Sequence, residues 1–414
     1  MRSTALSAAP LRRRRFFVLS LGALLLAGIS GSSAIAGEED WVASWGAPPS
    51  DPVAAPSNQT VREIARVSLG GERVRIRLSN ELGTAAVTLG AAHIARAGGG
   101  SAIVAGSDRT LTFSGEASIV IPPRALVYSD PVDLALPDLG SVAVSLYFPA
   151  GSSTVTTHQL GVQTAYIVSG DATAAASLTG ASTSLFRYLL SEVQVVASGE
   201  TAAVVTLGDS ITDGYCSTVD ANHRWPDFLA ARVAGRLGVV NEAISGNRVL
   251  HDNFGPNALS RLDRDVLVHP GAAFVTVLEG INDIGLPGAF APLSETVSAD
   301  DIIAGYKQLI ARAHAKGLRI YGATLTPFEG TTFPGYFTPA KEPIREAVNA
   351  WIRGSGGFDA VIDFDAVVRD PTHPTRILAA YDCGDHLHPN DAGYQAMANA
   401  LDLTLFRGGQ RRGD

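Results

Sequence analysis

The sequence predicts an α/β fold with a parallel sheet, preceded by an all-β sandwich or jelly-roll-like region. Strand-like runs separated by Gly, Pro, Asp and Ser fill the chain from Trp41 to about Val196. After Thr201, compact apolar strands alternate with helices, the pattern of a parallel sheet covered by helices on both faces. With 414 residues, 46% of them hydrophobic and only 17% charged, the chain can bury sizeable cores. We therefore expect a β domain over 37–198, an α/β domain over 199–406 and a polar tail over 407–414.

The first residues have the features of a secretory signal peptide. Four arginines, Arg12 to Arg15, precede an apolar run of about 14 residues from Phe16 to Ile29, and Ala34-Ile35-Ala36 follows. The run is too short to span a hydrocarbon core of ~30 Å comfortably. We expect residues 1–36 to be removed, leaving a secreted protein that begins near Gly37. The paired arginines also fit a twin-arginine signal, and a general export signal with a long basic region is the alternative.

Charge and cysteine content exclude several classes of protein. The net charge is −8, and removal of residues 1–36 would take away five arginines and no acidic residue, which changes it to −13. This balance argues against nucleic acid or an anionic membrane as a partner. Two cysteines are too few for a disulfide-built scaffold or a cysteine-rich metal site. We expect a monomer without a membrane span.

The β region begins with an apparent hairpin. Alternating residues over 64–69 and 74–78 flank Gly70-Gly71, which predicts two paired strands around a tight turn. Further short strand-like runs follow at 111–113, 117–121, 142–148 and 163–168. Residues 170–184 are poor in large side chains and are expected to form a surface loop.

In the α/β region the order of elements predicts where the chemistry lies. Expected strands cover 202–207, 239–241, 272–278, 318–325 and 358–362, and expected helices cover 224–237, 301–316, 340–353 and 391–405. In open parallel sheets, function is found in the loops at the carboxyl ends of the strands. The loops after the first three strands read Gly-Asp-Ser-Ile-Thr-Asp-Gly (208–214), Ala-Ile-Ser-Gly-Asn (243–247) and Glu-Gly-Ile-Asn-Asp (279–283).

A fourth block, Asp-His-Leu-His-Pro at 385–389, lies near the end of the chain. These four blocks, in this order, resemble those of the SGNH hydrolases, also called the GDSL esterase/lipase family. The resemblance covers about residues 202–405 and implies a flavodoxin-like three-layer fold and ester hydrolysis. The Gly-x-Ser-x-Gly elbow of the α/β-hydrolase fold is absent around Ser210.

The residue types in these blocks fit nucleophilic catalysis. Splitting an ester requires a nucleophile, a base, a group that orients the base, and donors for the developing oxyanion. Ser210, at the expected start of a helical turn, is the candidate nucleophile, His388 the base, and Asp385 its orienting carboxylate. Taken singly, these residues could instead be a helix-capping serine, a surface histidine and a turn aspartate. His386 is the weaker candidate for the base, because the Asp-x-x-His spacing and Pro389 favour His388.

The resemblance also implies the oxyanion donors: the backbone N–H of Gly246, the side-chain amide of Asn282 and the N–H of Ser210. We expect no metal, because no histidine pair with ligand spacing has a third ligand in support, and no cofactor. Asp209, Thr212, Asp213, Asn247 and Asp283 are expected to hold the loops in place by hydrogen bonds.

Cys216 and Cys383 flank the candidate catalytic residues. Cys216 lies six residues after Ser210, and Cys383 lies two residues before Asp385. If the triad forms, both loops meet at one rim, and an oxidising compartment allows a bond between the sulfurs to persist. We therefore predict a disulfide that clamps the nucleophile loop to the base loop; two free thiols are the alternative.

The substrate is left open by the sequence. Aromatic residues over 328–337 could line an acyl or aryl pocket or simply pack within their loop. The N-terminal β region, with Trp41 and Trp45, resembles the sandwich ahead of some secreted bacterial xylan-esterase-like SGNH members. Core packing or domain docking is favoured over sugar stacking for these tryptophans, and His93 and His158 are expected to be structural. The hypotheses are a secreted serine carboxylic ester hydrolase, a carbohydrate O-acetylesterase among its variants, or a non-catalytic carbohydrate- or surface-binding protein. Lipid, acetylated-carbohydrate and small-molecule esters all remain possible substrates.

Overall fold

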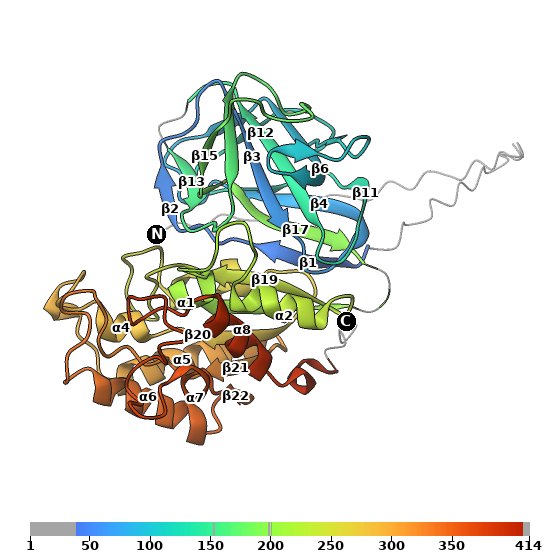
Figure 1. Cartoon of the computed structure of the whole chain (residues 1–414). Coiled ribbons are helices and arrows are strands. Elements are labelled where there is room, and N and C mark those ends of the chain that lie inside the picture. Colours follow the sequence, from blue (N-terminus) through green and yellow to red (C-terminus); the bar gives the residue numbers. More distant parts are fainter. Residues whose placement is uncertain (1–38, 152–153, 198, 200, 409–414) are drawn as a thin grey trace, which may run out of the picture. The chain divides into compact units, whose positions relative to one another are not determined.

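A computed structural model of the chain describes residues 39–151, 154–197, 199 and 201–408 (Figure 1). The expected signal peptide over 1–36 and most of the polar tail lie outside the described residues. From Asp40 on, the described residues belong to one compact unit. Across these ranges, no helix is both long and apolar enough to cross a membrane.

The β region, residues 41–196, is built mainly of two antiparallel sheets around a shared core, which confirms the expected all-β part. Ile76 and Val193 from one sheet and Val144 from the other are fully buried in that core. The first sheet contains β1 (Trp41–Gly46), β17 (Leu190–Val196), β4 (Gly71–Ser79), β10 (Leu126–Tyr128) and β11 (Val132–Leu136). The second contains β15 (Ser182–Ser184), β14 (Ala165–Ser169), β3 (Gln59–Arg66), β12 (Ser141–Phe148), β6 (Ala91–Gly99), β7 (Ala102–Ile103) and β8 (Arg109–Thr110). Smaller sheets join β16 (Arg187–Tyr188), β13 (Val155–His158) and β2 (Asp51–Val53), and β5 (Val87–Leu89) with β9 (Ile119–Ile121).

The hairpin predicted around Gly70-Gly71 is wrong. Strand β3 pairs with β12 and β14, whereas β4 pairs with β17, β10 and β11, so the two strands lie in different sheets. Alternation marks a strand with one face in the core, and both strands face the same core. The two glycines do not form a primed turn, because neither has a positive φ. They allow close backbone approach instead: a Cβ at Gly70 would lie 2.3 Å from the Leu136 carbonyl oxygen.

The parallel sheet of the α/β region, residues 202–406, has the strand order β19-β18-β20-β21-β22. The second strand in sequence thus lies outside the first, which is the flavodoxin-like order. These strands are β18 (Ala202–Gly208), β19 (Leu237–Ala243), β20 (Ala272–Leu278), β21 (Arg319–Ala323) and β22 (Ala360–Ile362). All seven residues of β18 are buried, as expected for a strand covered on both faces. The α/β fold class predicted from the sequence is confirmed.

The helices form two groups of mutual contacts, α2, α7 and α8 in one and α3, α4, α5 and α6 in the other, as in a sheet with helices on both faces. They are α1 (Ser210–Asp213), α2 (Trp225–Val233), α3 (Ala258–Leu262), α4 (Ile281–Gly285), α5 (Ala299–Ala315), α6 (Glu342–Gly354), α7 (Phe364–Val368) and α8 (Asp391–Ala400). A π-helical turn, η1 (Asp263–Leu267), and 3₁₀ turns, η2 (Leu293–Glu295) and η3 (Leu403–Phe406), complete the list.

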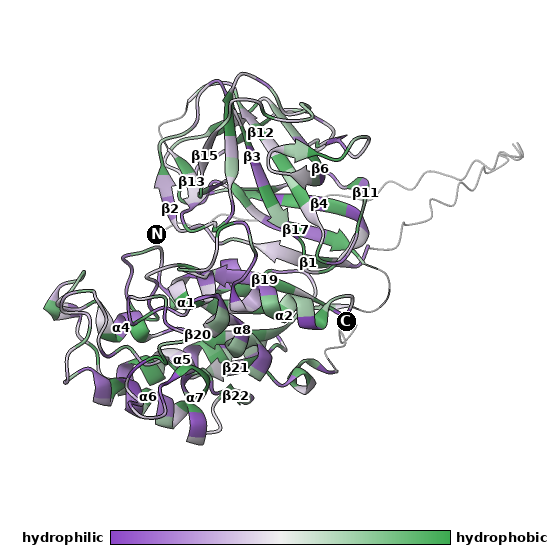
Figure 2. Cartoon of the chain, in the orientation of Figure 1, coloured by the Kyte–Doolittle hydropathy of each residue, from purple (hydrophilic) through white to green (hydrophobic). Residues whose placement is uncertain are grey.

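Local sequence explains where the main helices begin and which face they bury. A reciprocal capping box between Ser298 and Asp301 starts α5. Helix α6 is strongly amphipathic and buries Val348 and Ile352, and Figure 2 shows polar and apolar bands alternating along it. Helix α2 ends at Val233, earlier than predicted, because Gly235 takes a left-handed conformation and the chain enters β19.

The first strand of the β region packs against the edge of the parallel sheet. Val42 and Ala43 of β1 share an apolar cluster with Ala203 and Val240. The backbone N–H of Val239, on the edge strand β19, donates to a serine hydroxyl of the β region at 2.7 Å. The β region therefore covers an edge that would otherwise expose unpaired backbone groups.

Candidate active site

Ser210 is the first residue of α1, directly after β18. The Asp209 side chain caps this short helix by accepting from the backbone N–H of Ile211 at 3.0 Å. Ser210 itself is only 7% exposed. The sequence predicted a serine at the start of a helical turn beyond a buried strand, and the structure places it there.

His388 and Asp385 reach Ser210 from the far end of the chain. The Ser210 Oγ lies 2.8 Å from His388 Nε2, and His388 Nδ1 lies 2.6 Å from Asp385 Oδ2. Because a carboxylate can only accept, Nδ1 carries the proton and the Nε2 lone pair is left for the serine hydroxyl. The three groups thus form a continuous hydrogen-bonded chain in the order that general-base activation of a serine requires.

The carboxylate of Asp385 is held in its charged form. Burial on its own would raise its pKa, but hydrogen bonds from the His388 side chain and from the backbone N–H groups of Leu387 and His388 outweigh that effect and lower the pKa below its ordinary value. A charged carboxylate at this position is the group that a serine–histidine–aspartate triad uses to stabilise an imidazolium.

The alternative base, His386, points to a different carboxylate. Its Nδ1 contacts the side chain of Asp382, and its own side chain is 52% exposed. Of the two histidines in this block, His388 is the one whose ring meets the serine.

Gly246 and Asn282 lie on the same cavity as Ser210 and His388. Gly246 has a φ of +79°, and a Cβ there would lie 2.6 Å from the ring of Phe254, so this position requires glycine. Asn282, on α4, donates from Nδ2 to the Asn247 carbonyl at 2.9 Å and accepts from the Tyr336 hydroxyl at 2.7 Å. These two bonds fix which end of the amide is the donor and leave its second N–H for a ligand.

A buried arginine that was not predicted from the sequence joins the ends of β18 and β19 to the loop that contains Asn247. Arg261 of α3 donates to the carbonyls of Gly208 and Glu242 and, at 2.9 Å, to Asn247 Oδ1. It is 1% exposed. The sequence gives no signal for this role, because Arg261 lies in a five-residue helix that is not among the predicted elements.

Three buried carboxyl groups lie around this framework. Burial, together with nearby Asp283 and Asp213, raises the pKa of Asp209 to about 7. Burial also raises the pKa of Asp283 to about 6, although its two oxygens accept from backbone N–H groups, and it raises the pKa of Glu279 well above its ordinary value. Asp209 and Asp283 accept from backbone N–H groups of their loops, which is the role expected for them.

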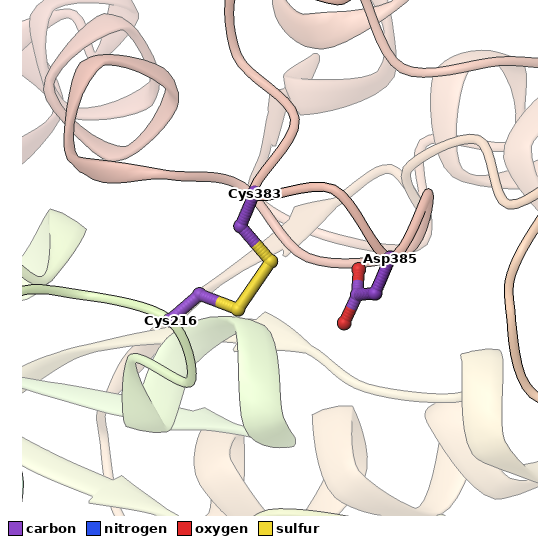
Figure 3. Close-up of side chains that lie close together, drawn as sticks. All are labelled: Cys216, Cys383 and Asp385. Carbon is purple, nitrogen blue, oxygen red and sulfur yellow. A yellow bond between two sulfur atoms is a disulfide. The ribbon is translucent and has the colours of Figure 1, made fainter.

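Cys216 and Cys383 form a disulfide, as predicted (Figure 3). It joins the loop after α1 to the loop that carries Asp385, with a Cα–Cα distance of 6.2 Å. Within the described residues, the two sulfurs and a carboxylate oxygen of Asp385 also form a group of three potential metal ligands. Because the sulfurs are bonded to each other, neither offers the thiolate that a metal would need.

The cavity in front of Ser210 is apolar and has a volume of about 260 Å³. Phe333 and Tyr336, two of the aromatic residues predicted to border the site, line it, whereas Phe337 packs on Phe328 with ring centroids 5.0 Å apart. Tyr215, which was not predicted to border the site, packs against His388 with the two ring centroids 4.5 Å apart. The lining comprises Ser210, Tyr215, Ser245, Gly246, Phe254, Asn282, Leu286, Phe290, Phe333, Tyr336, Leu387 and His388.

The structure shows how two tryptophans and one histidine of the β region are placed. Trp41 and Trp45 are 7% and 8% exposed, which agrees with packing and leaves no open ring face for a sugar. His158 does have a partner outside the β region: its Nε2 lies 3.0 Å from Asp213 Oδ1 on α1. The sequence did not reveal this partner, because no local pattern relates two residues 55 positions apart.

Part of the chain is similar to known proteins. Residues 206–396 match the family model described as the GDSL-like lipase/acylhydrolase family. No protein of curated function matches the sequence. Among solved structures, the chain is similar to an aryl esterase of Mycobacterium smegmatis (16% identity, 50% of this chain and 99% of that chain, TM-score 0.42). It is also similar to a GDSL-like lipase from Bacteroides thetaiotaomicron (20% identity, 50% of this chain and 88% of that chain, TM-score 0.38). A third similar structure is a carbohydrate acetylesterase family member from Sinorhizobium meliloti (18% identity, 50% of this chain and 97% of that chain, TM-score 0.39). Residues 206–396, a little under half of the chain, therefore resemble the GDSL-like lipase/acylhydrolase family, the SGNH hydrolases.

Proposed function

We propose that this protein is a serine esterase that hydrolyses carboxylic esters through an acyl-enzyme on Ser210. The family resemblance supports ester hydrolysis in general. The observation that carries the specific proposal is the hydrogen-bonded chain from Ser210 Oγ through His388 to Asp385, with distances of 2.8 and 2.6 Å. These groups come from positions 178 residues apart, and a non-catalytic scaffold has no need to bring them together.

In the first half of the reaction, Ser210 Oγ attacks the ester carbonyl carbon while His388 Nε2 takes the hydroxyl proton. The carbonyl oxygen becomes an oxyanion, for which the N–H groups of Ser210 and Gly246 and the Asn282 amide are the proposed donors. His388 then returns the proton to the alcohol oxygen, the carbon–oxygen bond to the alcohol breaks, and the acyl group remains on Ser210. Water attacks this acyl-enzyme by the same route, giving the acid and the free serine.

The chemistry of the cavity supports an uncharged, apolar acyl or aryl group as the substrate. Phe254, Phe290 and Phe333 provide ring surface, and the lining described above includes no Asp, Glu, Lys or Arg. A charged acyl group would lose hydration there without gaining a partner. We therefore expect neutral short-chain and aryl esters to be preferred over hemi-esters that carry a second carboxylate.

The proposed function includes export of the protein from the cell. The disulfide between Cys216 and Cys383 fits an oxidising compartment. We propose that the protein is secreted by way of the segment over 1–36, and N-terminal sequencing of material recovered from the medium tests this; an intact N-terminus would contradict it.

A panel of p-nitrophenyl esters from acetyl to long-chain, with an anionic hemi-ester and acetylated xylan added, tests activity and substrate class together. We expect the wild type and a Ser260→Ala control, which changes an exposed serine of α3, to hydrolyse the neutral esters equally. Ser210→Ala should lose at least ~10³-fold in kcat. Equal hydrolysis by Ser210→Ala would reject this nucleophile. A preference for acetylated xylan would identify a carbohydrate O-acetylesterase, and no turnover on any ester would favour the binding-protein alternative.

A further inference from the structure

The end of β13 places a histidine of the β region against the helix that carries Ser210. His158 is 5% exposed, and its Nδ1 lies 3.0 Å from the carbonyl oxygen of Pro48. Its Nε2 lies 3.0 Å from Asp213 Oδ1 and 3.1 Å from the Leu160 carbonyl oxygen. All three partners are acceptors, so both ring nitrogens face groups to which only an N–H can donate.

Asp213 connects His158 to the loop that carries Ser245 and Gly246. It lies on α1, one turn after Ser210, and is 2% exposed. Its second oxygen, Oδ2, accepts from both the backbone N–H and the hydroxyl of Ser245, each at 2.9 Å. Ser245 directly precedes Gly246. One buried carboxylate therefore joins the nucleophile helix, the loop with the expected oxyanion glycine and the β region.

We propose that His158 is a positioning residue for the esterase reaction, acting through Asp213 and Ser245 on the N–H groups of Ser210 and Gly246. The inference rests on the function proposed above. Helix α1 has only four residues, too few to fix its own orientation by internal hydrogen bonds. The two N–H groups must converge on one oxygen atom, and a displacement of ~1 Å at such a site costs about 100-fold in rate. The β region is then part of the catalytic apparatus.

Three histidine variants separate positioning from general packing. His158→Leu removes both donors, and we expect kcat to fall about 10- to 100-fold with KM within about twofold of wild type. His158→Gln keeps a donor toward Asp213, and we expect it to restore kcat to within about threefold of wild type. His93→Leu is the matched control, since it breaks a pair with Asp108 at 2.9 Å inside the β region, and it should leave kcat unchanged.

A second readout addresses the oxyanion site directly. An alkyl boronic acid mimics the tetrahedral intermediate, so its affinity for His158→Leu should fall in parallel with kcat, while KM for the substrate does not rise. A purely structural role predicts a lower unfolding temperature without this split. If His158→Leu does not fold, Ser245→Ala replaces it: the loss of one donor to Asp213 from a half-buried side chain should lower kcat about 2- to 10-fold.

The outcomes distinguish the two proposals. Inactive wild type, or a Ser210→Ala variant that is as active as wild type, would overturn the proposed function and this inference with it. An inactive Ser210→Ala variant beside a His158→Leu variant with the kcat and boronate affinity of His93→Leu would overturn this inference alone. If His158→Leu does not fold, a Ser245→Ala variant with wild-type kcat would also overturn this inference.

Discussion

Asn282 shows how single residues prepare the site. Its amide has one N–H committed to the Asn247 carbonyl, and its oxygen is committed to the hydroxyl of Tyr336 at 2.7 Å. The sequence motif predicted Asn282 as a candidate donor, but Tyr336 was expected only to border the site. The hydroxyl has a precise role because it prevents the amide from turning its oxygen toward a developing negative charge.

We expect Tyr336→Phe to lower kcat by about 2- to 10-fold with little change in KM, because the lost hydrogen bond orients a donor and the ring remains in the cavity. Asn282→Ala removes the donor itself and should lower kcat by about 100- to 1,000-fold. Steady-state kinetics on a p-nitrophenyl ester measure both. Tyr147→Phe, which removes a hydroxyl bonded to Asn58 in the β region, is the control. A Tyr336→Phe variant with wild-type kcat would show that the tyrosine does not orient the amide.

At the residue scale, the sequence predicted the residues to which the proposed chemistry is assigned and missed buried residues that contact their loops. Ser210, His388 and Asp385 belong to short motifs with fixed spacing, so they could be recognised directly. Arg261 and His158 act across the fold on partners that are distant in the sequence, and such contacts leave no periodic or local pattern.

Among the elements, two loops are decisive: the one after α1 and the one that carries Asp385 and His388. The disulfide between Cys216 and Cys383 closes a loop across 167 residues and joins these two elements next to the triad. Tyr394 of α8 adds a second link, since its hydroxyl donates to the Tyr215 carbonyl at 2.6 Å. Two links, one of them covalent, therefore join the loop after Ser210 to the elements around its proposed base.

We expect the double variant Cys216→Ser/Cys383→Ser to lose about 2–5 kcal/mol in the free energy of unfolding, because the unfolded chain is no longer cross-linked. Its kcat should also fall, since the loops can separate. Urea denaturation and ester kinetics measure the two effects. Alkylation of unfolded, unreduced wild type should label no thiol, and two labelled thiols would contradict the bond.

The bounds of elements in the α/β region could be predicted closely, whereas the pairing of strands in the β region could not. Strand β20 has the predicted bounds, and α5 and α6 differ by a few residues at their ends. Long buried strands and amphipathic helices have strong periodic signals. The supposed hairpin between β3 and β4 failed because alternation identifies a strand but not its partner.

On the scale of the whole molecule, a buried ionic cluster connects the β region to the parallel sheet. His269 contacts Glu192 of β17 at 2.9 Å and Glu242 of β19 at 3.1 Å, and Arg77 of β4 contacts Glu192 at 3.2 Å. Burial alone would lower the pKa of His269, but the two glutamates outweigh burial and raise the pKa to about 10. Burial likewise would raise the pKa of Glu192, but Arg77 and His269 lower it to about 2.

These shifts predict a pH window for stability. The raised pKa of His269 means that its contribution is complete below its ordinary value of 6.5 and is lost as the pH rises through about 10. The lowered pKa of Glu192 means that its contribution is complete above 4.5 and is lost as the pH falls toward 2. Both contributions are complete between pH 4.5 and 6.5.

We expect His269→Gln to lower the free energy of unfolding by about 3–5 kcal/mol in that window, because the buried carboxylate of Glu192 loses a charged partner. The difference from wild type should shrink as the pH rises through 10. Urea denaturation at several pH values measures it, with His314→Gln, a half-exposed pair with Asp359, as the control. A difference that does not depend on pH would contradict the charged state assigned to His269.

The order of the regions could be predicted at this scale, because composition and periodicity change near Thr201. The contacts between them could not be predicted, since Glu192, His269 and Glu242 lie in different elements and carry no shared motif. A net charge of −8 also gives no indication of which charges are buried.

Covalent trapping shows whether Ser210 is the nucleophile and whether His388 activates it. The wild type is treated with a fluorophosphonate, digested and analysed by mass spectrometry, beside His388→Ala and the His386→Ala control. We predict one adduct per chain, on Ser210, formed at the same rate in His386→Ala and at least ~10³-fold more slowly in His388→Ala. An active enzyme that carries its adduct on another residue, or that labels Ser210 equally fast without His388, would contradict the account.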